Sequence, residues 1–258
     1  WPYIGGGGDQ SGLIDRTGSP RPHSFQRQSW WAKAPMVHMA RRIAPEALLP
    51  ADPGYGNPPK RRPAVLLSDW NPASPVLHAE AVEVYSNAEQ VELFLNGRSL
   101  GSRYVEPTGA PLQWSVPYEP GTLTARATIG GREVATHELR TAGAPARIRL
   151  DPDSVRLAPG WDNVDFVHVT VVDAQGVAVP GADNMISFSV DGPGAIAAVD
   201  NADNSSHEPF QAARRSAYRG SCFAVLRATG TSGPIRLTAS AAGLESSSVS
   251  IATGEGAP

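Results

Sequence analysis

From Val76 onward, apolar and polar residues alternate with a period of two, which predicts a series of β-strands. The stretch AEAVEVYSNAEQVELFLNGRSLG places the pair Asn96 and Gly97 between two alternating runs. GTLTARATIGGREVATHEL places Gly130 and Gly131 in the same way. Both pairs predict tight hairpins, because the two central residues of a type I′ turn need a positive φ.

LQWSVPYEPG adds a strand that carries Trp114, and PMVHMA adds another near the front of the chain. These segments give about six or seven short strands within roughly a hundred residues, a pattern typical of an Ig-like β-sandwich. The small residues and proline of TAGAPA, residues 141–146, then predict a linker.

A second series of strand-like segments follows the linker, from ARIRLDP to SSSVSIAT. Their alternation predicts which side chains face a core: Ile186, Phe188 and Val190 from one strand, and Cys222, Ala224 and Leu226 from another. The fold class expected for the chain is therefore mainly β, with two Ig-like β-sandwiches in tandem.

The front of the chain has a different pattern. Phe25, Gln28 and Trp31 lie at helical spacing, and Ser19 followed by Pro20 is a plausible start, so we expect a helix from Pro20 to Trp31 with Ser19 as its N-cap. One such helix must be covered by a neighbour to bury its apolar side chains. Residues 44–75 are rich in proline, which predicts an irregular insertion between strands.

Composition narrows the class of protein. A length of 258 residues favours two domains, and a net charge of −3 argues against nucleic acid as a partner. The sequence has no apolar run long enough to span a membrane, and the single cysteine, Cys222, excludes an intrachain disulfide and a cysteine-based zinc cluster. Because the chain begins at Trp1 without a methionine, we expect it to be a piece of a longer polypeptide.

No catalytic constellation is apparent. Glycoside hydrolysis needs two carboxyl groups that flank a bond, but the glutamates of the predicted strands, such as Glu80 and Glu83, occupy polar positions typical of a solvated face. No G-x-S-x-G motif is present, and the six histidines lack the close spacing of a zinc site. We therefore expect no catalytic residue, metal or cofactor in this chain.

Two features leave alternatives open. The segment VDNADNSSHEPFQAARRSAYRGSC has oxygen ligands suitable for calcium, but it lacks the calcium-loop pattern, so turn-capping by its Asn and Asp residues is favoured. Trp70 and Trp161 fall in predicted loops, where a flat ring could stack on a sugar, whereas Trp114 within a strand is expected in the core.

Three motifs in order resemble one family. VEVYSNAEQVELFLNGRSLG with LQWSVPYEPGTLTARAT resembles the Ig-like domain after the catalytic barrel of bacterial glycoside hydrolase family 2 enzymes, chiefly β-galactosidases. ADNMISFSVDGPGAIAAVDN with the HEPF segment is similar to their last domain, and SGLIDRTGSPRPHSFQRQSWWAKAPMVHM to the end of their barrel. The resemblance implies a barrel tail at 1–34, a first Ig-like sandwich at 35–142 and a second at 143–258.

The resemblance also implies roles for particular residues. The family's two catalytic glutamates lie on barrel strands, upstream of anything present here, so the chain would be an accessory region, inactive alone, of a retaining β-glycosidase. Trp1 and Tyr3 would come from the end of the barrel at which active sites are built, where they would either line the sugar site or simply shape their loop. His207 and Glu208 would anchor a structural loop by hydrogen bonds, and Phe210 would pack into the core.

The expected partners follow from the same resemblance. They are the upstream barrel of the same polypeptide and, for the enzyme, galactosides or a polysaccharide; a homo-oligomer is left open, and a secreted or periplasmic location in a bacterium is expected. The alternative function is a non-catalytic module for carbohydrate binding or cell-surface adhesion, because such modules share this architecture.

Overall fold

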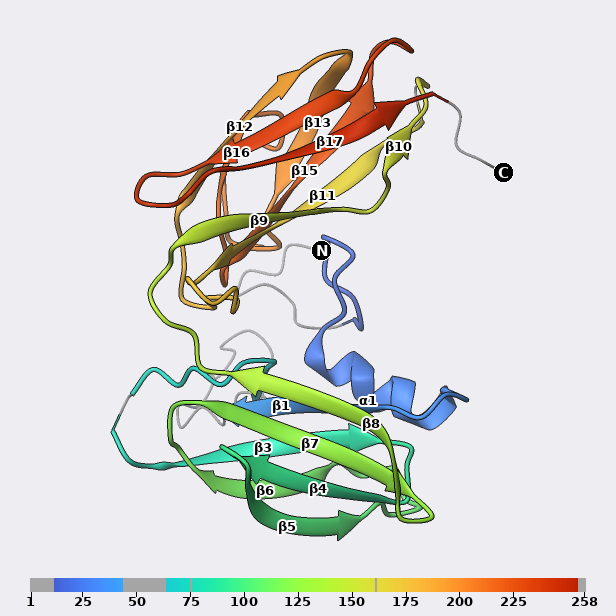
Figure 1. Ribbon diagram of the computed structural model, residues 1–258, viewed down its shortest axis with the longest axis vertical. Helices are drawn as coiled ribbons and strands as arrows, with labels where there is room; N and C mark the ends of the chain where they lie inside the picture. Colours follow the sequence, from blue (N-terminus) through green and yellow to red (C-terminus); the bar gives the residue numbers. More distant parts are fainter. Residues whose placement is uncertain (1–11, 44–63, 75, 161, 255–258) are drawn as a thin grey trace, which may run out of the picture. The chain divides into compact units, whose positions relative to one another are not determined.

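The computed structural model describes residues 12–43, 64–74, 76–160 and 162–254. The chain forms two compact units. The first unit comprises residues 20–141, and the second unit combines residues 142–258 with residues 1–19. Each is a mainly β structure in which two mainly antiparallel sheets enclose a core (Figure 1). The chain is therefore two Ig-like β-sandwiches, as the strand pattern predicts.

In the first unit, the described residues form two four-stranded sheets, ordered β2-β1-β3-β6 and β5-β4-β7-β8. All their pairings are antiparallel. The strands are β1 (Val37–Ile43), β2 (Val65–Leu67), β3 (Ala79–Ser86), β4 (Gln90–Leu95), β5 (Arg98–Tyr104), β6 (Leu112–Pro117), β7 (Thr122–Ile129) and β8 (Arg132–Arg140).

Both predicted hairpin turns of the first unit are present. Asn96 and Gly97 have φ of 51° and 79°, and Gly130 and Gly131 have φ of 56° and 76°. Asn96 also holds the neighbouring β6–β7 turn: its Nδ2 donates to the Pro120 carbonyl at 3.1 Å, and its Oδ1 accepts the Thr122 N–H at 2.9 Å. One asparagine thus stabilises two turns of the sandwich.

A single helix, α1 (Pro22–Trp31), lies along β1 in the described part of the chain (Figure 1). It begins two residues later than expected, and Ser19 is not its N-cap. The reason is local, because the Ser19 N–H donates to the Asp15 carboxylate at 3.1 Å and Pro22 then takes the first helical position. Of the apolar residues expected to be covered, Phe25 stacks on the His38 ring at 3.6 Å, whereas Trp31 remains 71% exposed. Among the described residues, no helix is long and apolar enough to cross a membrane.

The proline-rich segment contributes to the core of the first unit. Most of it, residues 44–63, lies outside the described residues, but β2 pairs with β1 and is followed by Trp70. Trp70 is fully buried, and its Nε1 donates to the Glu119 carbonyl at 3.0 Å. Trp114 is also buried, as its alternating strand predicts. The last part of the insertion therefore belongs to the sandwich and is not an irregular surface loop.

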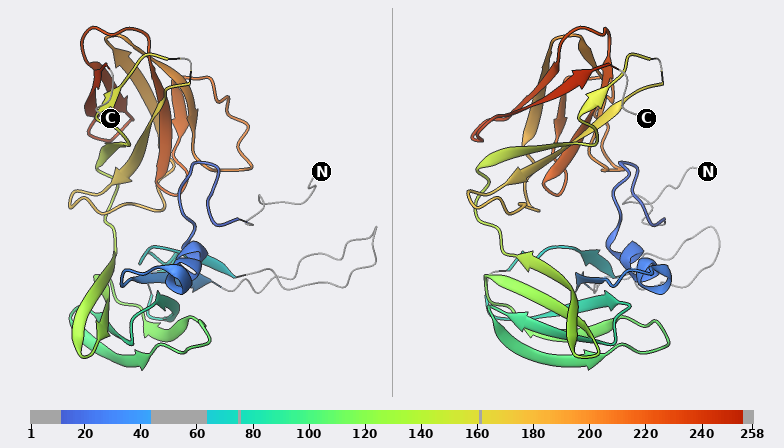
Figure 2. Two further views of the ribbon diagram at one scale, coloured as in Figure 1. Left: turned by 90° about the vertical axis from the view of Figure 1, so that its right-hand side faces the viewer. Right: turned by 45° about the vertical axis from the view of Figure 1, so that its right-hand side comes forward.

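The second unit also contains two sheets, ordered β10-β17-β16-β12-β14 and β13-β15-β11-β9. The two views of Figure 2 show these layers and the loop between β13 and β14, which runs beside residues 12–19. The strands are β9 (Arg147–Pro152), β10 (Arg156–Leu157), β11 (Asp165–Val172), β12 (Met185–Asp191), β13 (Gly194–Asp200), β14 (Arg214–Ser216), β15 (Ser221–Ala228), β16 (Ile235–Ser240) and β17 (Ser247–Thr253).

The predicted inward-facing residues meet in the core of the second unit. Ile186, Phe188, Ala224 and Leu226 are all buried, and Cys222 is buried with them. Burial raises the pKa of the Cys222 thiol to about 12, so the sulfur is a neutral, unreactive packing group.

Asp165, the first residue of β11, is a buried acid. Its side chain is 2% exposed, and neither carboxyl oxygen has a hydrogen-bond partner within the described ranges. Desolvation, with a smaller contribution from nearby Asp153, raises its pKa to about 6. Ser154 and His168 lie close enough to lower it, but no group of Ser154 reaches hydrogen-bond geometry. The ionised carboxylate therefore weakens the fold.

The raised pKa of Asp165 predicts how the stability of the fold depends on pH. Because its folded pKa is raised above the ordinary value of 3.8, its favourable contribution is complete below pH 3.8 and is lost as pH rises through about 6. The variant Asp165→Asn keeps the shape without the charge. We expect the free energy of unfolding of this variant, minus that of the parent chain, to increase by about 2 to 3 kcal/mol between about pH 3.5 and about pH 8. Urea denaturation of both proteins measures this difference. An unchanged difference across this range would contradict the assignment.

Candidate functional site

The segment from Asp200, the last residue of β13, to Ser216, the last residue of β14, gathers the polar residues that stand out in the sequence; we call it the Asp200 loop. Its central residue is Arg215, which is fully buried. Nη2 of Arg215 donates to Asp200 Oδ1 and to Asn201 Oδ1, both at 3.0 Å, and Nη1 donates to the Glu208 carbonyl at 2.9 Å. A buried guanidinium costs much free energy unless its charge and donors are matched, and here the loop is folded around it.

Glu208 contributes its side chain to the same arrangement. Its carboxylate accepts the Ser216 hydroxyl at 2.9 Å and, at the longer distance of 3.4 Å, the Ser216 N–H. Arg215 Nε lies 3.4 Å from Glu208 Oε2, an ion pair without hydrogen-bond geometry. Glu208 thus has the contacts that an anchor of this loop requires.

His207 and Phe210 differ from the expectation. His207 is exposed and makes no hydrogen bond or ion pair to any residue that the structure describes, so the anchoring role does not fit it. Phe210 is 51% exposed and not in the core. Its ring instead makes two cation–π contacts, because the guanidinium carbons of Arg16 and Arg215 each lie 5.5 Å from the ring centroid. The apolar type of Phe210 suggested burial, whereas the ring lies partly exposed beside two arginines.

The buried carboxylates of the described residues are nearly all engaged. The expectation of a solvated face is wrong for Glu80 and Glu83, which are each 9% exposed. Glu80 pairs with the buried Arg41 at 3.2 Å, and Glu83 pairs with Arg42 at 3.0 Å. Among the buried acids, only Asp165 lacks a partner within the described ranges. No pair of free buried carboxyl groups is therefore available there for acid–base or nucleophilic work on a glycosidic bond.

The fold also brings together two histidines that are far apart in the sequence, which spacing alone could not reveal. The rings of His38 and His137 lie 4.3 Å apart, and His38 Nε2 is 3.1 Å from the Ser68 hydroxyl. Desolvation lowers the pKa of both, and desolvation together with the nearby charge of His137 lowers that of His38 to about 3. The pair is therefore neutral at neutral pH. In the part of the chain that the structure describes, no group of three His, Cys, Asp or Glu residues could hold a metal.

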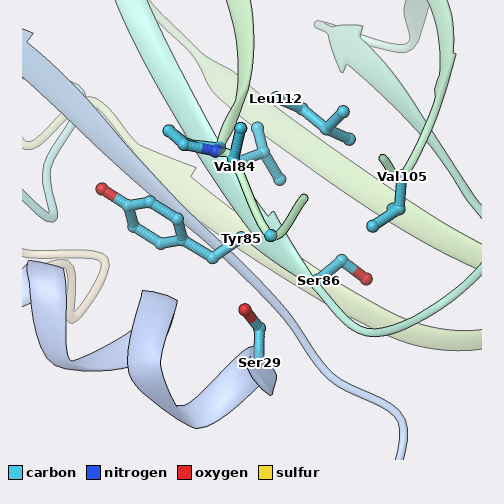
Figure 3. Close-up of a pocket in the computed structure, with 9 residues that line it drawn as sticks. Ser29, Val84, Tyr85, Ser86, Val105 and Leu112 are labelled. Carbon is cyan, nitrogen blue, oxygen red and sulfur yellow. The ribbon is translucent and has the colours of Figure 1, made fainter. Parts of the chain in front are cut away.

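A small pocket of the first unit lies between α1 and the loop before β6. Figure 3 shows Ser29 on the helix facing Tyr85 and Ser86 of β3. The pocket has room for about one water molecule, which is far too little for a sugar ring. Its rim is tied to the helix because Trp30 Nε1 donates to the Gly109 carbonyl at 3.0 Å. A Cβ at Gly109 would lie 2.6 Å from that nitrogen, so this contact requires glycine.

The structure does not bring the residues predicted to contact sugar together in one site. Trp1, Tyr3 and Trp161 lie outside the described residues. Trp70 is a candidate platform by sequence because it follows a proline-rich loop, but its ring is fully buried against Tyr118 and presents no free face. A sugar-stacking role for Trp70 is therefore incompatible with its position.

The contrast between two adjacent residues of the Asp200 loop can be measured. Glu208→Ala should lower the free energy of unfolding by about 2 kcal/mol, because Ser216 and Arg215 lose charged partners. His207→Ala is the matched control, and it should change stability by less than about 0.5 kcal/mol because its side chain is exposed. Chemical denaturation of both variants checks this. Equal losses, or a larger loss for His207→Ala, would restore the anchoring role of the histidine.

Two family models match the chain. Residues 148–250 match the glycoside hydrolase family 2 C-terminal domain 5, and residues 80–135 match a domain of unknown function, DUF4982. The first match covers nearly all strands of the second unit, and the second covers the β3–β8 region of the first unit.

Similar proteins extend this likeness to nearly the whole chain. The β-galactosidase BoGH2A of Bacteroides ovatus is 33% identical over 244 residues, which are 95% of this chain and 25% of that protein. A glycosyl hydrolase family 2 member from Bacteroides cellulosilyticus superposes with a TM-score of 0.81 at 33% identity, over 94% of this chain and 32% of that one. A β-glycosidase from Bacteroides vulgatus gives a TM-score of 0.79 at 30% identity, over 93% and 28%.

The chain thus spans about a quarter of the length of the curated β-galactosidase that it matches. The part of this chain that matches that protein includes most of residues 148–250, which match the C-terminal domain model. The chain therefore belongs to glycoside hydrolase family 2 and corresponds to the C-terminal region of its members.

Proposed function

We propose that this chain is the accessory C-terminal region of a retaining β-glycosidase, with β-galactosides as the favoured substrates of the whole enzyme. The observation that carries the proposal is the 33% identity to a β-galactosidase across 95% of the chain. In a retaining enzyme one carboxylate is the nucleophile and a second acts as acid and then as base. Those two groups would belong to a barrel in the same polypeptide, upstream of this region.

The state of the acidic residues supports an accessory role. Glu80, Glu83 and Asp200 are each held by an arginine, and Asp173 accepts backbone N–H groups. Carboxylates that are committed in this way cannot attack a sugar or pass a proton to it without breaking the fold. Asp165 is free of partners among the described residues, but a single buried acid does not make the required pair.

What the region contributes is a folded support. Two sandwiches with separate cores can present outer faces to a barrel, and α1 leaves Trp30 and Trp31 44% and 71% exposed. Large exposed apolar side chains commonly mark an interaction surface. We propose that this helix face is covered by the barrel in the whole enzyme. Export from a bacterial cell and self-association stay predictions.

The alternative function, a carbohydrate-binding or adhesion module, loses one of its two proposed platforms because Trp70 is buried. Trp161 lies outside the described residues, so its sugar-stacking role stays a prediction. The test is whether a galactoside or polysaccharide binds the purified chain and whether Trp161→Ala weakens that binding. Both results together would favour a carbohydrate-binding module over an accessory region.

The absence of catalysis is directly testable. The purified chain should not hydrolyse nitrophenyl β-galactoside, β-glucuronide or β-mannoside above the rate of buffer alone, because the buried carboxylates of the described residues include no free pair for the nucleophile and the acid. The chain should be produced in a host without endogenous β-galactosidase, with a whole family 2 β-galactosidase as the positive control. Turnover that co-purifies with the chain and scales with its concentration would overturn the accessory assignment.

The coding sequence upstream of Trp1 tests the remaining part of the proposal. A barrel with one glutamate at the end of each of two strands is the expected result. An adhesin, or any unrelated domain, in that position would contradict the assignment to a β-glycosidase while leaving the fold of this region intact.

A further inference from the structure

The segment before α1 folds as a closed turn that presents one arginine. The Asp15 N–H donates to the Ser19 carbonyl at 2.9 Å, and the Gly18 N–H donates to the Asp15 carbonyl at 3.1 Å. The Asp15 carboxylate accepts the Thr17 N–H at 2.8 Å and the Thr17 hydroxyl at 2.6 Å. Gly18 has a φ of +84°, which permits the tight bend. Residues 15–19 are thus braced by their own hydrogen bonds, and the Arg16 side chain extends to make contacts elsewhere; we call them the Arg16 turn.

Arg16 contacts the Asp200 loop within the second unit. Its Nη2 donates to Asp200 Oδ1 at 2.7 Å and to the Asp203 carbonyl at 2.8 Å. Its guanidinium carbon lies 5.5 Å from the centroid of Phe210. A carboxylate, a carbonyl and an aromatic face together match a planar guanidinium better than the compact charge of an ammonium.

The acceptors for Arg16 are held in place by the loop itself. Asp200 is fixed by Arg215, and the Asp203 N–H donates to Asn201 Oδ1 at 3.0 Å. The Asp203 carboxylate accepts the Ser205 hydroxyl and N–H, which lowers its pKa, with a smaller contribution from Arg16. Because each acceptor has a second partner that holds it, the site is preformed and little ordering is needed when the arginine enters.

Charge also favours a cation at this position. Apart from Arg16, the charged side chains that meet here are the buried guanidinium of Arg215 and the carboxylates of Asp200, Asp203 and Glu208. Arg16 reduces the excess of negative charge, and it retains 29% exposure of its side chain, so its departure would leave an open site.

We propose that the Asp200 loop is a guanidinium-binding site and that Arg16 is its built-in ligand, which fastens the Arg16 turn to the sandwich of the second unit. The site then accepts a small alkylguanidinium whenever the Arg16 side chain is removed.

Chemical rescue tests the site in the full 258-residue chain. In Arg16→Ala, the amide resonances of Asn201 and Asp203 should move away from their parent positions in ¹⁵N NMR spectra. Ethylguanidinium should shift them back saturably, with a dissociation constant in the millimolar range, whereas ethylammonium should not. The parent chain should show no saturable shift because Arg16 fills its site.

Arg219→Ala is the matched control for this titration. Arg219 also lies over an aromatic ring, with its guanidinium carbon 5.4 Å from the Tyr218 centroid, but it makes no ion pair with a described residue. Its removal should create no site for ethylguanidinium. The proposal fails if Arg16→Ala gives no saturable shift, if both cations act equally, or if Arg219→Ala responds in the same way.

A measurement on the parent chain covers the case in which Arg16→Ala does not fold. The guanidinium N–H protons of Arg16 should exchange with water more slowly than those of Arg219, because the former are hydrogen-bonded in the site. Equal exchange of the two would show that Arg16 is not held, and it would overturn the proposal without any substitution.

Discussion

The buried ion pair between Arg215 and Asp200 is the constraint on which the polar end of the second unit depends. Arg215 is fully buried and Asp200 is 7% exposed, so neither charge is stabilised by bulk water. Their 3.0 Å contact is sufficient only with further partners, and the loop supplies them from Asn201 and the Glu208 carbonyl. The course of residues 200–216, and the docking of Arg16, follow from the need to satisfy these two groups.

A second carboxylate acts in a similar way where the second unit resumes after the first. Asp173 accepts the N–H of Gly143 at 2.7 Å and those of Gln175 and Val177 at 2.9 Å each. These bonds, that from Gly143 first, lower the pKa of Asp173. The unit boundaries fall at residues 19/20 and 141/142. Within the second unit, contacts to carboxylates therefore fix the chain just before the first unit, at Arg16, and just after it, at Gly143.

Much of the fold could be predicted from local sequence. The Asn96-Gly97 and Gly130-Gly131 pairs mark hairpins because few other residues adopt positive φ, and alternation identifies core residues such as Leu226. Local pattern failed where the partner is distant in sequence. Glu80 and Glu83 sit at polar positions that suggested solvent, but arginines of β1 cover them.

The candidate site was predictable in location and only partly in detail. The density of Asn, Asp, Glu and Arg indicated an ordered loop, yet the sequence did not show that the Phe210 ring lies beside two arginines, or that His207 has no hydrogen-bond or ion-pair partner among the described residues. Arg16 was missed because its partner is 184 positions away, and the proline content around Trp70 masked a core tryptophan. The missing information is tertiary in each case.

Hydrogen exchange of individual backbone amides tests the central claim that carboxylates of the second unit order its loops. The Asn201 backbone N–H donates a hydrogen bond to the Asp200 carboxylate, and the Gly143 N–H donates one to the Asp173 carboxylate. At neutral pH both should exchange far more slowly than unprotected amides, as expected for groups that open only when these contacts break. Exchange of both amides at the rate of an unstructured peptide would contradict the account.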